Sequence, residues 1–305
     1  YMMIPNDWVL LAACLGIIIL LSPSGFYGKW FGAIWLLPLV FYHYESPPIG
    51  QMNFTLLDVG QGLSAVIQTK NHILVFDTGS KVGQNYDMGE SVVAPFLRSI
   101  GIKKIDMLVI SHPDNDHIGG AKSLYHYFKI LRARTSSPDE LLPFVSEYCL
   151  RGESWQWDGV DFKFLYPTTE NLDLDNDSSC VLSVTNSSHK TILLTGDIEK
   201  FAEKYLIENE IDHLASDILV APHHGSKTSA LNEFVDQVHP QYVLFPVGYR
   251  NRYHFPHVTV IEKYQNIHAN LLATDTSGAL QFKLNEIISA PTEYRLQQQR
   301  YWSFH

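Results

Sequence analysis

Residues 111–120 read Ser-His-Pro-Asp-Asn-Asp-His-Ile-Gly-Gly, and this stretch decides the fold. The apolar run at residues 105–110 comes directly before it and predicts a buried strand. The glycine pair at its end predicts the start of a helix that extends to about Tyr127. The loop between strand and helix carries four side chains that can ligate a metal: His112, Asp114, Asp116 and His117.

Four ligands in so short a loop are enough to serve two cations. We expect His112 and Asp114 to hold one ion, and Asp116 and His117 to hold the other. Two ions about 3.5–4 Å apart can clamp both the attacking and the leaving oxygen of a displacement reaction. The alternative is a solvated acidic turn with incidental histidines. The position at a strand end and the second group of histidines further along the chain favour the metal site.

The rest of the chain alternates short apolar runs with turns, which is typical of an α/β domain. The predicted strands cover residues 52–59, 64–70, 73–77, 105–110, 162–166, 180–185, 191–195, 218–221, 242–246, 271–274 and 279–284. The predicted helices cover residues 88–100, 119–127, 198–208, 230–238 and 257–264. Each half begins with strands and continues with alternating strands and helices. This order predicts an αββα sandwich of two stacked mixed sheets with outer helices.

Two apolar runs without charged residues, 8–21 and 30–42, precede this domain. Each is shorter than the ~20 residues that a perpendicular transmembrane helix needs. We expect a short membrane-associated hairpin that turns at residues 22–25. The alternatives are an apolar hairpin packed on the soluble domain, or the end of a longer segment. The expected organisation is thus a hairpin with its linker at 1–48, the α/β domain at 49–286 and a tail at 287–305.

Charge and cysteine content narrow the function less than the loop does. The formal net charge of −10 argues against a broadly basic surface that binds nucleic acid, although several of the acids are expected beside cations. The three cysteines, Cys14, Cys149 and Cys180, lie far apart in the sequence. They define neither a zinc finger nor a disulfide framework, and they say little about the redox compartment.

The motifs resemble those of the metallo-β-lactamase superfamily. His-Pro-Asp-Asn-Asp-His at 112–117 is similar to its H-x-[H/D]-x-D-H signature, in the variant with Asp at the third position. Phe-Asp-Thr-Gly at 76–79 resembles its first motif, whose acid (here Asp77) supports the metal loop through hydrogen bonds. Leu-Thr-Gly-Asp at 194–197 resembles the fourth, whose acid (here Asp197) bridges both metals. Ala-Pro-His-His-Gly-Ser at 221–226 resembles the final histidine motif.

Four further stretches narrow the resemblance to the C-terminal hydrolase domain of ComEC-type proteins, the DNA-uptake channels of competent bacteria: residues 57–62, 176–182, 223–229 and 251–257. The apolar hairpin is similar to the last membrane segments of those channels. The resemblance implies a metal-dependent nuclease that degrades the strand that is not transported. It also implies that DNA, the membrane, a larger upstream channel region and other uptake proteins are its partners. The implied location is the bacterial inner membrane, with the hydrolase domain on the periplasmic or outer face.

One departure from the superfamily bears on the metal. The third motif normally supplies a histidine, but here the position reads Asn176-Asp177-Ser178-Ser179. With Asp114 in place of another histidine, the site has two nitrogen ligands fewer than a typical dizinc enzyme. Oxygen-rich sites favour harder ions, so Mn²⁺ is the expected metal, with Zn²⁺ or Mg²⁺ as alternatives. Asn176 is either a weak contact or a supporting residue.

The remaining candidates come from the distal motifs. One of the adjacent pair His223 and His224 is expected to be a metal ligand and the other a substrate contact or structural residue, and the sequence does not choose between them. Either of them, or His257, is a candidate to protonate the leaving oxygen, in a reaction that Asp116 and Asp197 support through the metals. Nearby cations are candidates to contact DNA phosphates: Lys81, Lys227, Arg250 and Arg252. The alternative functions are a non-catalytic DNA-binding vestibule of the channel, and a hydrolase of a small phosphodiester or lactone.

Overall fold

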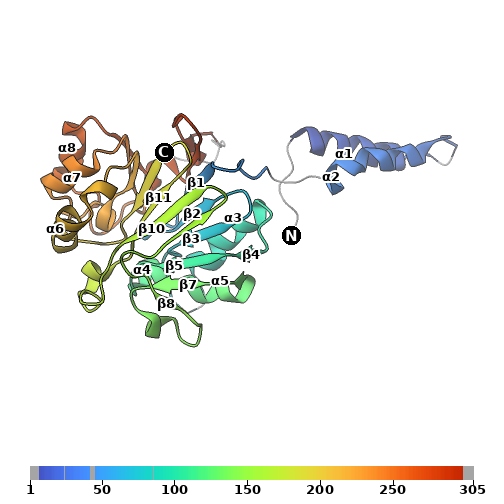
Figure 1. The fold of residues 1–305 in the computed structure, drawn as a ribbon. Helices are drawn as coiled ribbons and strands as arrows, with labels where there is room; N and C mark the ends of the chain where they lie inside the picture. Colours follow the sequence, from blue (N-terminus) through green and yellow to red (C-terminus); the bar gives the residue numbers. More distant parts are fainter. Residues whose placement is uncertain (1–6, 24, 42–44, 85, 298–305) are drawn as a thin grey trace. The chain divides into compact units, whose positions relative to one another are not determined.

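The computed structural model of the protein describes residues 7–23, 25–41, 45–84 and 86–297 (Figure 1). Parts of the predicted hairpin turn, of the second apolar run, of the linker and of the tail therefore lie outside the described residues. The chain divides into two compact units, Tyr1–Glu45 with Pro95–Lys103, and Ser46–Ala94 with Lys104–His305.

The first unit contains the apolar helices. Helix α1 (Asp7–Leu20) packs against a 3₁₀ helix (Lys29–Leu36), which continues into α2 (Leu37–Val40). Two glycines let the backbones approach closely, because a Cβ on Gly16 would lie 2.7 Å from the carbonyl oxygen of Gly32. Of the helices that the structure describes, none combines the length and the apolar character that a membrane crossing requires. Most of α3 (Ala94–Ser99) also belongs to this unit.

The second unit is built on two sheets. The first has the strand order β17-β16-β1-β2-β3-β5-β7-β8. Its strands are β1 (Met52–Leu56), β2 (Ala65–Gln68), β3 (Ile73–Phe76), β5 (Met107–Ile110), β7 (Ala133–Thr135), β8 (Glu147–Tyr148), β16 (Leu280–Leu284) and β17 (Thr292–Glu293). Strand β1 pairs antiparallel with both β2 and β16, whereas β3, β5, β7 and β8 run parallel to one another. The sheet is therefore mixed.

The second sheet has the order β15-β14-β13-β12-β11-β10-β9. Its strands are β9 (Ser154–Trp157), β10 (Val160–Tyr166), β11 (Val181–Thr185), β12 (Thr191–Leu194), β13 (Ile218–Val220), β14 (Tyr242–Phe245) and β15 (Asn270–Ala273). Strands β12 to β15 run parallel, and β9, β10 and β11 form an antiparallel meander. A separate short pair joins β4 (Lys104–Ile105) to β6 (Lys129–Ile130).

The main core lies between the two sheets. Alternate side chains of strands from both sheets are buried there, among them Phe54 and Phe282 of the first sheet and Phe162 and Leu194 of the second. Such alternation places one face of each strand in the core and is the pattern from which the strands are predicted. A second cluster covers the outer face of the second sheet, where the helices pack: α6 (Lys200–Asn209), α7 (Asn232–Val238) and α8 (Val258–Asn266).

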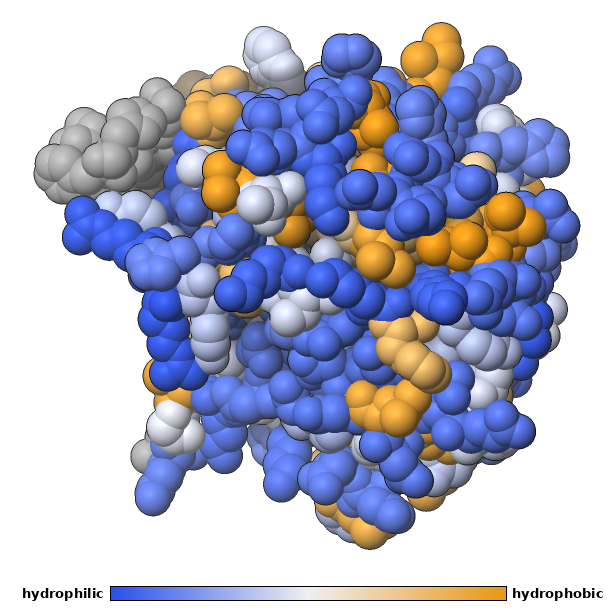
Figure 2. All heavy atoms as spheres, turned by 90° about the vertical axis from the view of Figure 1, so that its left-hand side faces the viewer, coloured by the Kyte–Doolittle hydropathy of each residue, from blue (hydrophilic) through white to orange (hydrophobic). Residues whose placement is uncertain are grey.

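Figure 1 shows the resulting layers, with α6, α7 and α8 outside one sheet and α5 (Ala121–Tyr127) outside the other. The predicted αββα sandwich of mixed sheets is confirmed. On the side of α6, α7 and α8 the surface is mostly hydrophilic, with apolar patches separated by polar residues (Figure 2). The remaining helices are short: a π-helical turn (Gly89–Val93), α4 (Asn115–Ile118), α9 (Thr274–Ser277), α10 (Tyr294–Gln297) and the 3₁₀ turns Pro138–Leu141, Asp175–Ser178, Ile211–His213 and Pro222–Gly225.

Two predicted elements differ in detail. The expected strand at 105–110 is split, because Ile105 pairs with β6 and β5 begins at Met107. The expected helix at 88–100 is a π-helical turn that continues into α3, where Pro95 stands near the start of the α-helical part. The backbone N–H of Ala94 still donates to the carbonyl oxygen of Gly89 in the π-helical turn, and Pro95, which has no N–H, follows it.

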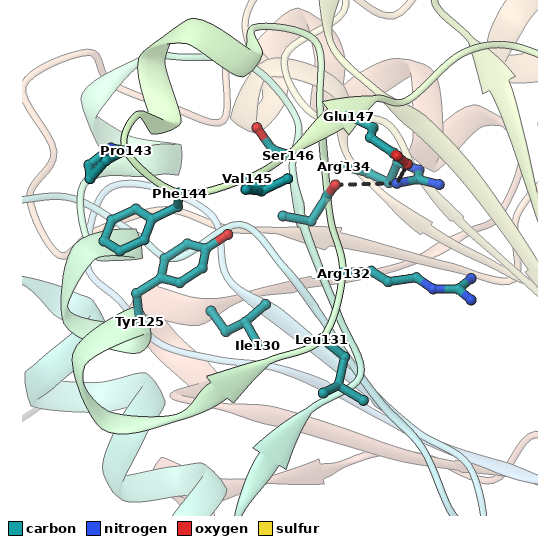
Figure 3. A pocket seen from close by; sticks show the side chains of 11 residues that line it. Tyr125, Ile130, Leu131, Arg132, Arg134, Pro143, Phe144, Val145, Ser146 and Glu147 are labelled. Atoms are coloured by element: carbon teal, nitrogen blue, oxygen red, sulfur yellow. Dashed lines mark hydrogen bonds and ion pairs between the residues drawn. The ribbon is translucent and has the colours of Figure 1, made fainter.

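A pocket of about 610 Å³ lies beside β7 and β8 (Figure 3). The rings of Tyr125 and Phe144 stack in it with their centroids 3.8 Å apart. The guanidinium of Arg134 is held by Glu147 and by Glu153. None of the predicted site residues lines this pocket.

Candidate metal centre

The predicted metal loop leaves the middle of the first sheet. Strand β5 ends at Ile110, and its parallel neighbours β3 and β7 lie on either side. His112 follows within two residues, and the short helix α4 then carries Asp116 and His117. A β-strand buried on both sides fixes the position of its carboxyl end, where ligands commonly bind in α/β sheets. The loop is thus presented by one of the most ordered parts of the domain.

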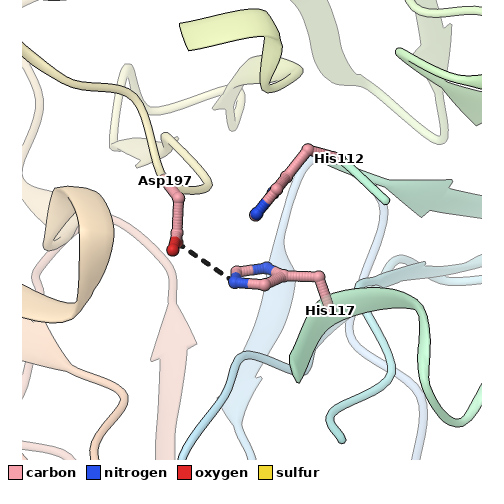
Figure 4. A group of neighbouring side chains, drawn as sticks. All are labelled: His112, His117 and Asp197. Atoms are coloured by element: carbon pink, nitrogen blue, oxygen red, sulfur yellow. Dashed lines mark ion pairs between the residues drawn. The ribbon is translucent and has the colours of Figure 1, made fainter. Parts of the chain in front are cut away.

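Three buried side chains form a first group. Single ligand atoms of His112, His117 and Asp197 all lie within 4.8 Å of one another. Figure 4 shows the two imidazoles of the metal loop and the carboxylate of Asp197, which comes from another loop, pointing toward one another. The closest approach is 3.1 Å, between Nε2 of His117 and Oδ1 of Asp197.

A second group adjoins the first and shares His117 with it. It consists of Asp116, His117 and His224. Nε2 of His224 lies 3.3 Å from Oδ2 of Asp116 and 3.4 Å from Oδ2 of Asp197. Asp197 therefore turns one oxygen toward each group, which is the arrangement that a bridging ligand requires.

Unpaired polar atoms test whether these residues fit a metal. Nε2 of His112, His117 and His224 and Oδ1 of Asp197 are all buried, and none has a hydrogen-bond partner among the described residues. Leaving such atoms unpaired in a protein interior costs free energy, so native proteins rarely do so without a ligand. Imidazole nitrogens together with carboxylate oxygens are ligands of divalent transition metals. The donor set fits a divalent metal centre.

Hydrogen bonds behind the two loop histidines fix which nitrogen faces inward. Nδ1 of His117 lies 2.8 Å from Oδ2 of Asp77, so it donates to that carboxylate and leaves Nε2 free. Ser111 donates through both its backbone N–H and its hydroxyl to Asp77, each at 2.7 Å. Nδ1 of His112 is 3.0 Å from the same hydroxyl oxygen. Such hydrogen-bonding partners orient metal-binding imidazoles and raise their basicity, which is the role expected of Asp77.

The choice between the two adjacent histidines follows from their surroundings. Nδ1 of His224 donates to the carbonyl oxygen of Pro246 at 2.9 Å, and its Nε2 points into the second group. Nδ1 of His223 instead lies 3.1 Å from Oε1 of Glu199 and 3.2 Å from Oγ1 of Thr228. Both histidines have positive φ angles, 47° and 55°, a conformation that non-glycine residues seldom adopt. The structure thus includes His224 in a group that could hold a metal ion and leaves His223 beside that group.

The loop that carries Asp197 is held by the segment where the superfamily has its third histidine. The backbone N–H of Asp197 donates to Oγ of Ser179 at 3.1 Å. Asp177 accepts from the backbone N–H groups of Glu199 and Ala202. The backbone carbonyl oxygen of Asn176 accepts from both the hydroxyl and the backbone N–H of Ser179. The segment therefore supports the centre through Ser179 and Asp177.

The pKa shifts reflect an excess of negative charge. Burial alone lowers the pKa of His224, but the charge of Asp197 and the closeness of the Asp116 and Asp197 carboxylates raise it to about 9. Burial likewise lowers the pKa of His117, and the charges of Asp197 and Asp77 raise it well above its usual value. For Asp116, burial raises the pKa, but the neighbouring imidazoles of His224 and His117 lower it to about 2. A site of this charge attracts cations.

The structure groups the loop ligands differently from the sequence prediction. The side chain of Asp114 is 53% exposed and lies in neither group, with Oδ2 3.6 Å from Nε2 of His112. The neighbouring imidazole of His112 lowers the pKa of Asp114. His112 is instead grouped with His117 and Asp197, and Asp116 with His117 and His224.

The other candidates lie around the centre. His257 is the N-cap of α8, where its Nδ1 accepts from the backbone N–H of Thr259, so the structure does not bring it into either group. The four expected phosphate contacts are exposed: Lys81, Lys227, Arg250 and Arg252. Lys81 is next to the metal loop, since its backbone exchanges hydrogen bonds with the side chain of Asn115.

A disulfide that the sequence did not reveal joins Cys149 and Cys180. Cys149 follows β8 in the first sheet and Cys180 precedes β11 in the second, so the bond links the two sheets through their common core. The backbone N–H of Cys180 donates to the carbonyl oxygen of Ser111, next to His112. The remaining cysteine, Cys14, is a free thiol in α1.

Four more residues of the site were missed, and only some carried a signal. Ser111 directly precedes His112, and Ser179 lies in the segment 176–179 that the sequence singled out, so both carried a signal. Glu199 and Phe255 reach the centre only because distant loops meet there.

Comparisons with known proteins agree with this geometry. The family model described as the Metallo-beta-lactamase superfamily matches residues 57–248. Competence protein ComA of Neisseria gonorrhoeae is 36% identical over 281 residues, which cover 92% of this chain and 39% of that protein. Recombination protein 2 of Haemophilus influenzae is 32% identical over 249 residues, covering 81% of this chain and 31% of that protein. The chain thus spans between 31% and 39% of the length of these relatives.

Among solved structures, Igni18 is similar in fold. It is described as a novel metallo hydrolase from the hyperthermophilic archaeon Ignicoccus hospitalis. The TM-score is 0.52 at 15% identity, and the match covers 76% of this chain and 100% of Igni18. At this identity the likeness shows the fold alone.

Proposed function

Because this chain belongs to the metallo-beta-lactamase superfamily, we propose that it is a metal-dependent hydrolase whose substrate is the phosphodiester backbone of DNA. The observation that carries the proposal is the position of Asp197, whose Oδ1 lies 3.1 Å from Nε2 of His117 and whose Oδ2 lies 3.4 Å from Nε2 of His224. A site for two cations suits displacement at phosphorus. The resemblance to ComEC-type uptake proteins supports DNA as the substrate, and degradation of the strand that is not transported as the task.

The reaction is the addition of water to phosphorus with departure of the sugar oxygen. Divalent cations, when bound, would lower the pKa of a water molecule and neutralise charge on the nonbridging oxygens of the phosphate. Of the three candidates, we propose His223 as the residue that donates a proton to the leaving oxygen. In support, its Nε2 lies 3.7 Å from Oδ2 of Asp197 and its Nδ1 lies 3.1 Å from Oε1 of Glu199. Asp77 and Ser111 keep the loop imidazoles in one tautomer. The exposed cations Lys227, Arg250 and Arg252 contact the neighbouring phosphates.

We infer Mn²⁺ as the preferred ion. Three carboxylates, those of Asp114, Asp116 and Asp197, stand in or beside the two groups, and the segment 176–179 supplies no imidazole. Harder ions prefer such oxygen donors, whereas imidazole-rich sites suit zinc.

The disulfide supports a location outside the cytoplasm. Structural disulfides form and persist in oxidising compartments such as the bacterial periplasm. Cys149 and Cys180 are both fully buried, so the bond is made as the domain folds. The hairpin unit has large apolar side chains on its surface, including Trp8, Leu21 and Trp30, which suits contact with lipid. We therefore propose an inner-membrane protein that holds the hydrolase domain on the outer face, beside the upstream channel region and other uptake proteins.

A nuclease assay on the full chain tests the proposal. Metal-free protein is loaded with Mn²⁺, Zn²⁺ or Mg²⁺ and given single- and double-stranded DNA, with bis(p-nitrophenyl) phosphate as a small substrate. Cleavage of DNA that Asp197→Asn abolishes supports the proposal. If every metal form hydrolyses only the small substrate, the protein is a small-phosphodiester hydrolase. If it binds DNA and hydrolyses neither substrate, it is a passive vestibule.

A further inference from the structure

The loop from Gly248 to His257, which joins β14 to α8, carries a stack of aromatic rings that begins at the metal centre. The ring of Phe255 stacks on that of His224, with centroids 6.4 Å apart and an interplanar angle of 20°. Tyr253 stacks on Phe255 at 5.4 Å and 18°. The stack therefore extends from a metal-group imidazole outward to Tyr253, which is 48% exposed.

Two arginines alternate with the exposed aromatic rings of this loop. The guanidinium of Arg250 lies 5.1 Å from the ring of Tyr249, and that of Arg252 lies 4.8 Å from the ring of Tyr253. Tyr249 is 67% exposed. Within the part of the chain that the structure describes, neither guanidinium has a carboxylate partner at ion-pair distance. Both are free to bind an anion, although the protein as a whole is acidic.

The loop is held in this shape before any ligand arrives. The side chain of Asn251 donates to the carbonyl oxygens of Gly248 and Phe255 and accepts from the backbone N–H of Phe255. The N–H of His257 donates to the carbonyl oxygen of Gly225, next to His224. A preformed loop loses little conformational entropy when it binds.

A charge of the metal loop also acts on an arginine of this loop. The hydrogen bond to Tyr253 raises the pKa of Arg252, and the charge of Asp116 adds to the rise. Because Phe255 of the same loop stacks on His224, a phosphate held by Arg252 is close to the candidate metal centre.

We propose that Tyr249 and Tyr253, with Arg250 and Arg252, form a stacking platform that selects single-stranded nucleic acid and leads its backbone to the metal centre. This inference rests on the proposed nuclease function and adds its substrate class. Aromatic rings that stack with bases, beside cations that follow the backbone, are how proteins bind single strands without sequence preference. In a duplex the base faces are already stacked on one another, so the rings find no partner.

The experiment compares KM and kcat of the metal-loaded full chain on four substrates. These are a single-stranded oligonucleotide of about 12 residues, an abasic oligomer of equal length, a hairpin duplex, and bis(p-nitrophenyl) phosphate. The variants are Tyr249→Leu with Tyr253→Leu, and Tyr253→Phe, which keeps the ring. Tyr148→Leu is the matched control, because this exposed tyrosine is on β8.

The double leucine variant should raise KM for the single strand about 5- to 100-fold for each stacked base lost. It should leave KM for the abasic oligomer and kcat for the small substrate unchanged, and Tyr253→Phe and Tyr148→Leu should behave like the unaltered protein. If the double variant and the unaltered protein cleave single strands and duplexes in the same ratio, the proposed stacking platform is contradicted. The proposed nuclease function is not contradicted by that result. If the unaltered protein hydrolyses the small substrate but no DNA, the proposed function fails and the platform fails with it.

Discussion

The carboxylate of Asp77 lies 2.8 Å from Nδ1 of His117, and both side chains are completely shielded from solvent. Asp77 also accepts two hydrogen bonds from Ser111, through which it reaches His112. One buried acid thus orients two imidazoles of the metal centre, although it touches neither of their inward-facing nitrogens.

Replacing Asp77 by Asn should weaken metal binding about 10- to 100-fold, because the amide keeps the shape but loses the charge that orients the imidazoles. The measurement is a competitive titration against a chromophoric chelator. Asp106→Asn is the matched control, since Asp106 is a buried acid that accepts from the backbone of Ile73. An equal loss of metal affinity in both variants would refute the specific role of Asp77.

Substitutions of the two adjacent histidines, His223 and His224, should have different effects, one on metal binding and the other on catalysis. We expect His224→Asn to lower the bound metal content and His223→Asn to keep it while kcat falls by about 100-fold or more. Asn is the suitable replacement because it tolerates the positive φ angles of both positions. Metal analysis of the purified variants and steady-state rates are the two measurements. Full metal content in His224→Asn would remove it from the ligand set.

Metal preference should respond to Asp114. The unaltered protein is expected to be more active with Mn²⁺ than with Zn²⁺ at matched occupancy. Asp114→His places an imidazole near Nε2 of His112 and should shift that ratio toward zinc. Rates are measured with each metal at known occupancy. The inference that the oxygen-rich site prefers Mn²⁺ fails if zinc already gives the higher rate in the unaltered protein.

Removing the disulfide should destabilise the domain by about 3–4 kcal/mol, the loop-closure estimate for its sequence separation of 31 residues. The comparison is urea unfolding of the unaltered protein and of Cys149→Ala with Cys180→Ala. Cys14→Ala is the control, because that cysteine is free. Cells are quenched in acid, and the protein is then denatured in the presence of an alkylating agent, because both cysteines are buried in the native state. Cys149 and Cys180 should react only after a reductant is added; if both react without a reductant, the proposed compartment is wrong.

Glu203 should make stability depend on pH. It is buried in α6, where its carboxylate accepts from the backbone N–H groups of Ala230 and Leu231. Burial raises its pKa to about 7, above the usual value of 4.5, although these hydrogen bonds oppose the rise. The folded state therefore binds the proton more tightly than the unfolded state. The resulting stability is fully present below pH 4.5 and is lost as pH rises through 7.

The contribution of Glu203 amounts to at most about 3 kcal/mol. We expect the free energy of unfolding to fall between pH 4.5 and 7 in the unaltered protein and to fall less in Glu203→Gln. Urea unfolding in the presence of a chelator measures this difference without a contribution from metal binding. Parallel pH profiles for the two proteins would show that Glu203 does not titrate in this range.

The central strands could be predicted because their side chains alternate into one core, and the metal loop could be predicted because it follows such a strand. Strands β7 and β8 were missed, since Ala133–Thr135 and Glu147–Tyr148 are too short to show alternation. Their place in the sheet is set by their neighbours and not by their own sequence.

Contacts between distant loops were the other part that the sequence did not show. Cys149 and Cys180 come together only when the two sheets stack, so their spacing in the sequence does not predict the disulfide. The same holds for His223 and Glu199, which follow different strands. The sequence singled out the segment 176–179 through Asn176. In the structure, however, the residue of this segment that holds the Asp197 loop is Ser179, whose hydroxyl accepts from the backbone N–H of Asp197.

The metal ligands come from both halves of the chain, His112 and His117 from one and Asp197 and His224 from the other. A ribosome makes the first half well before the second, so the early histidines emerge without their later partners. Strand β1 likewise has no β16 to pair with until the last part of the domain has been made. The centre cannot be assembled until nearly the whole domain has been synthesised and has left the ribosome. Any activity that depends on this centre is therefore expected only from the completed domain.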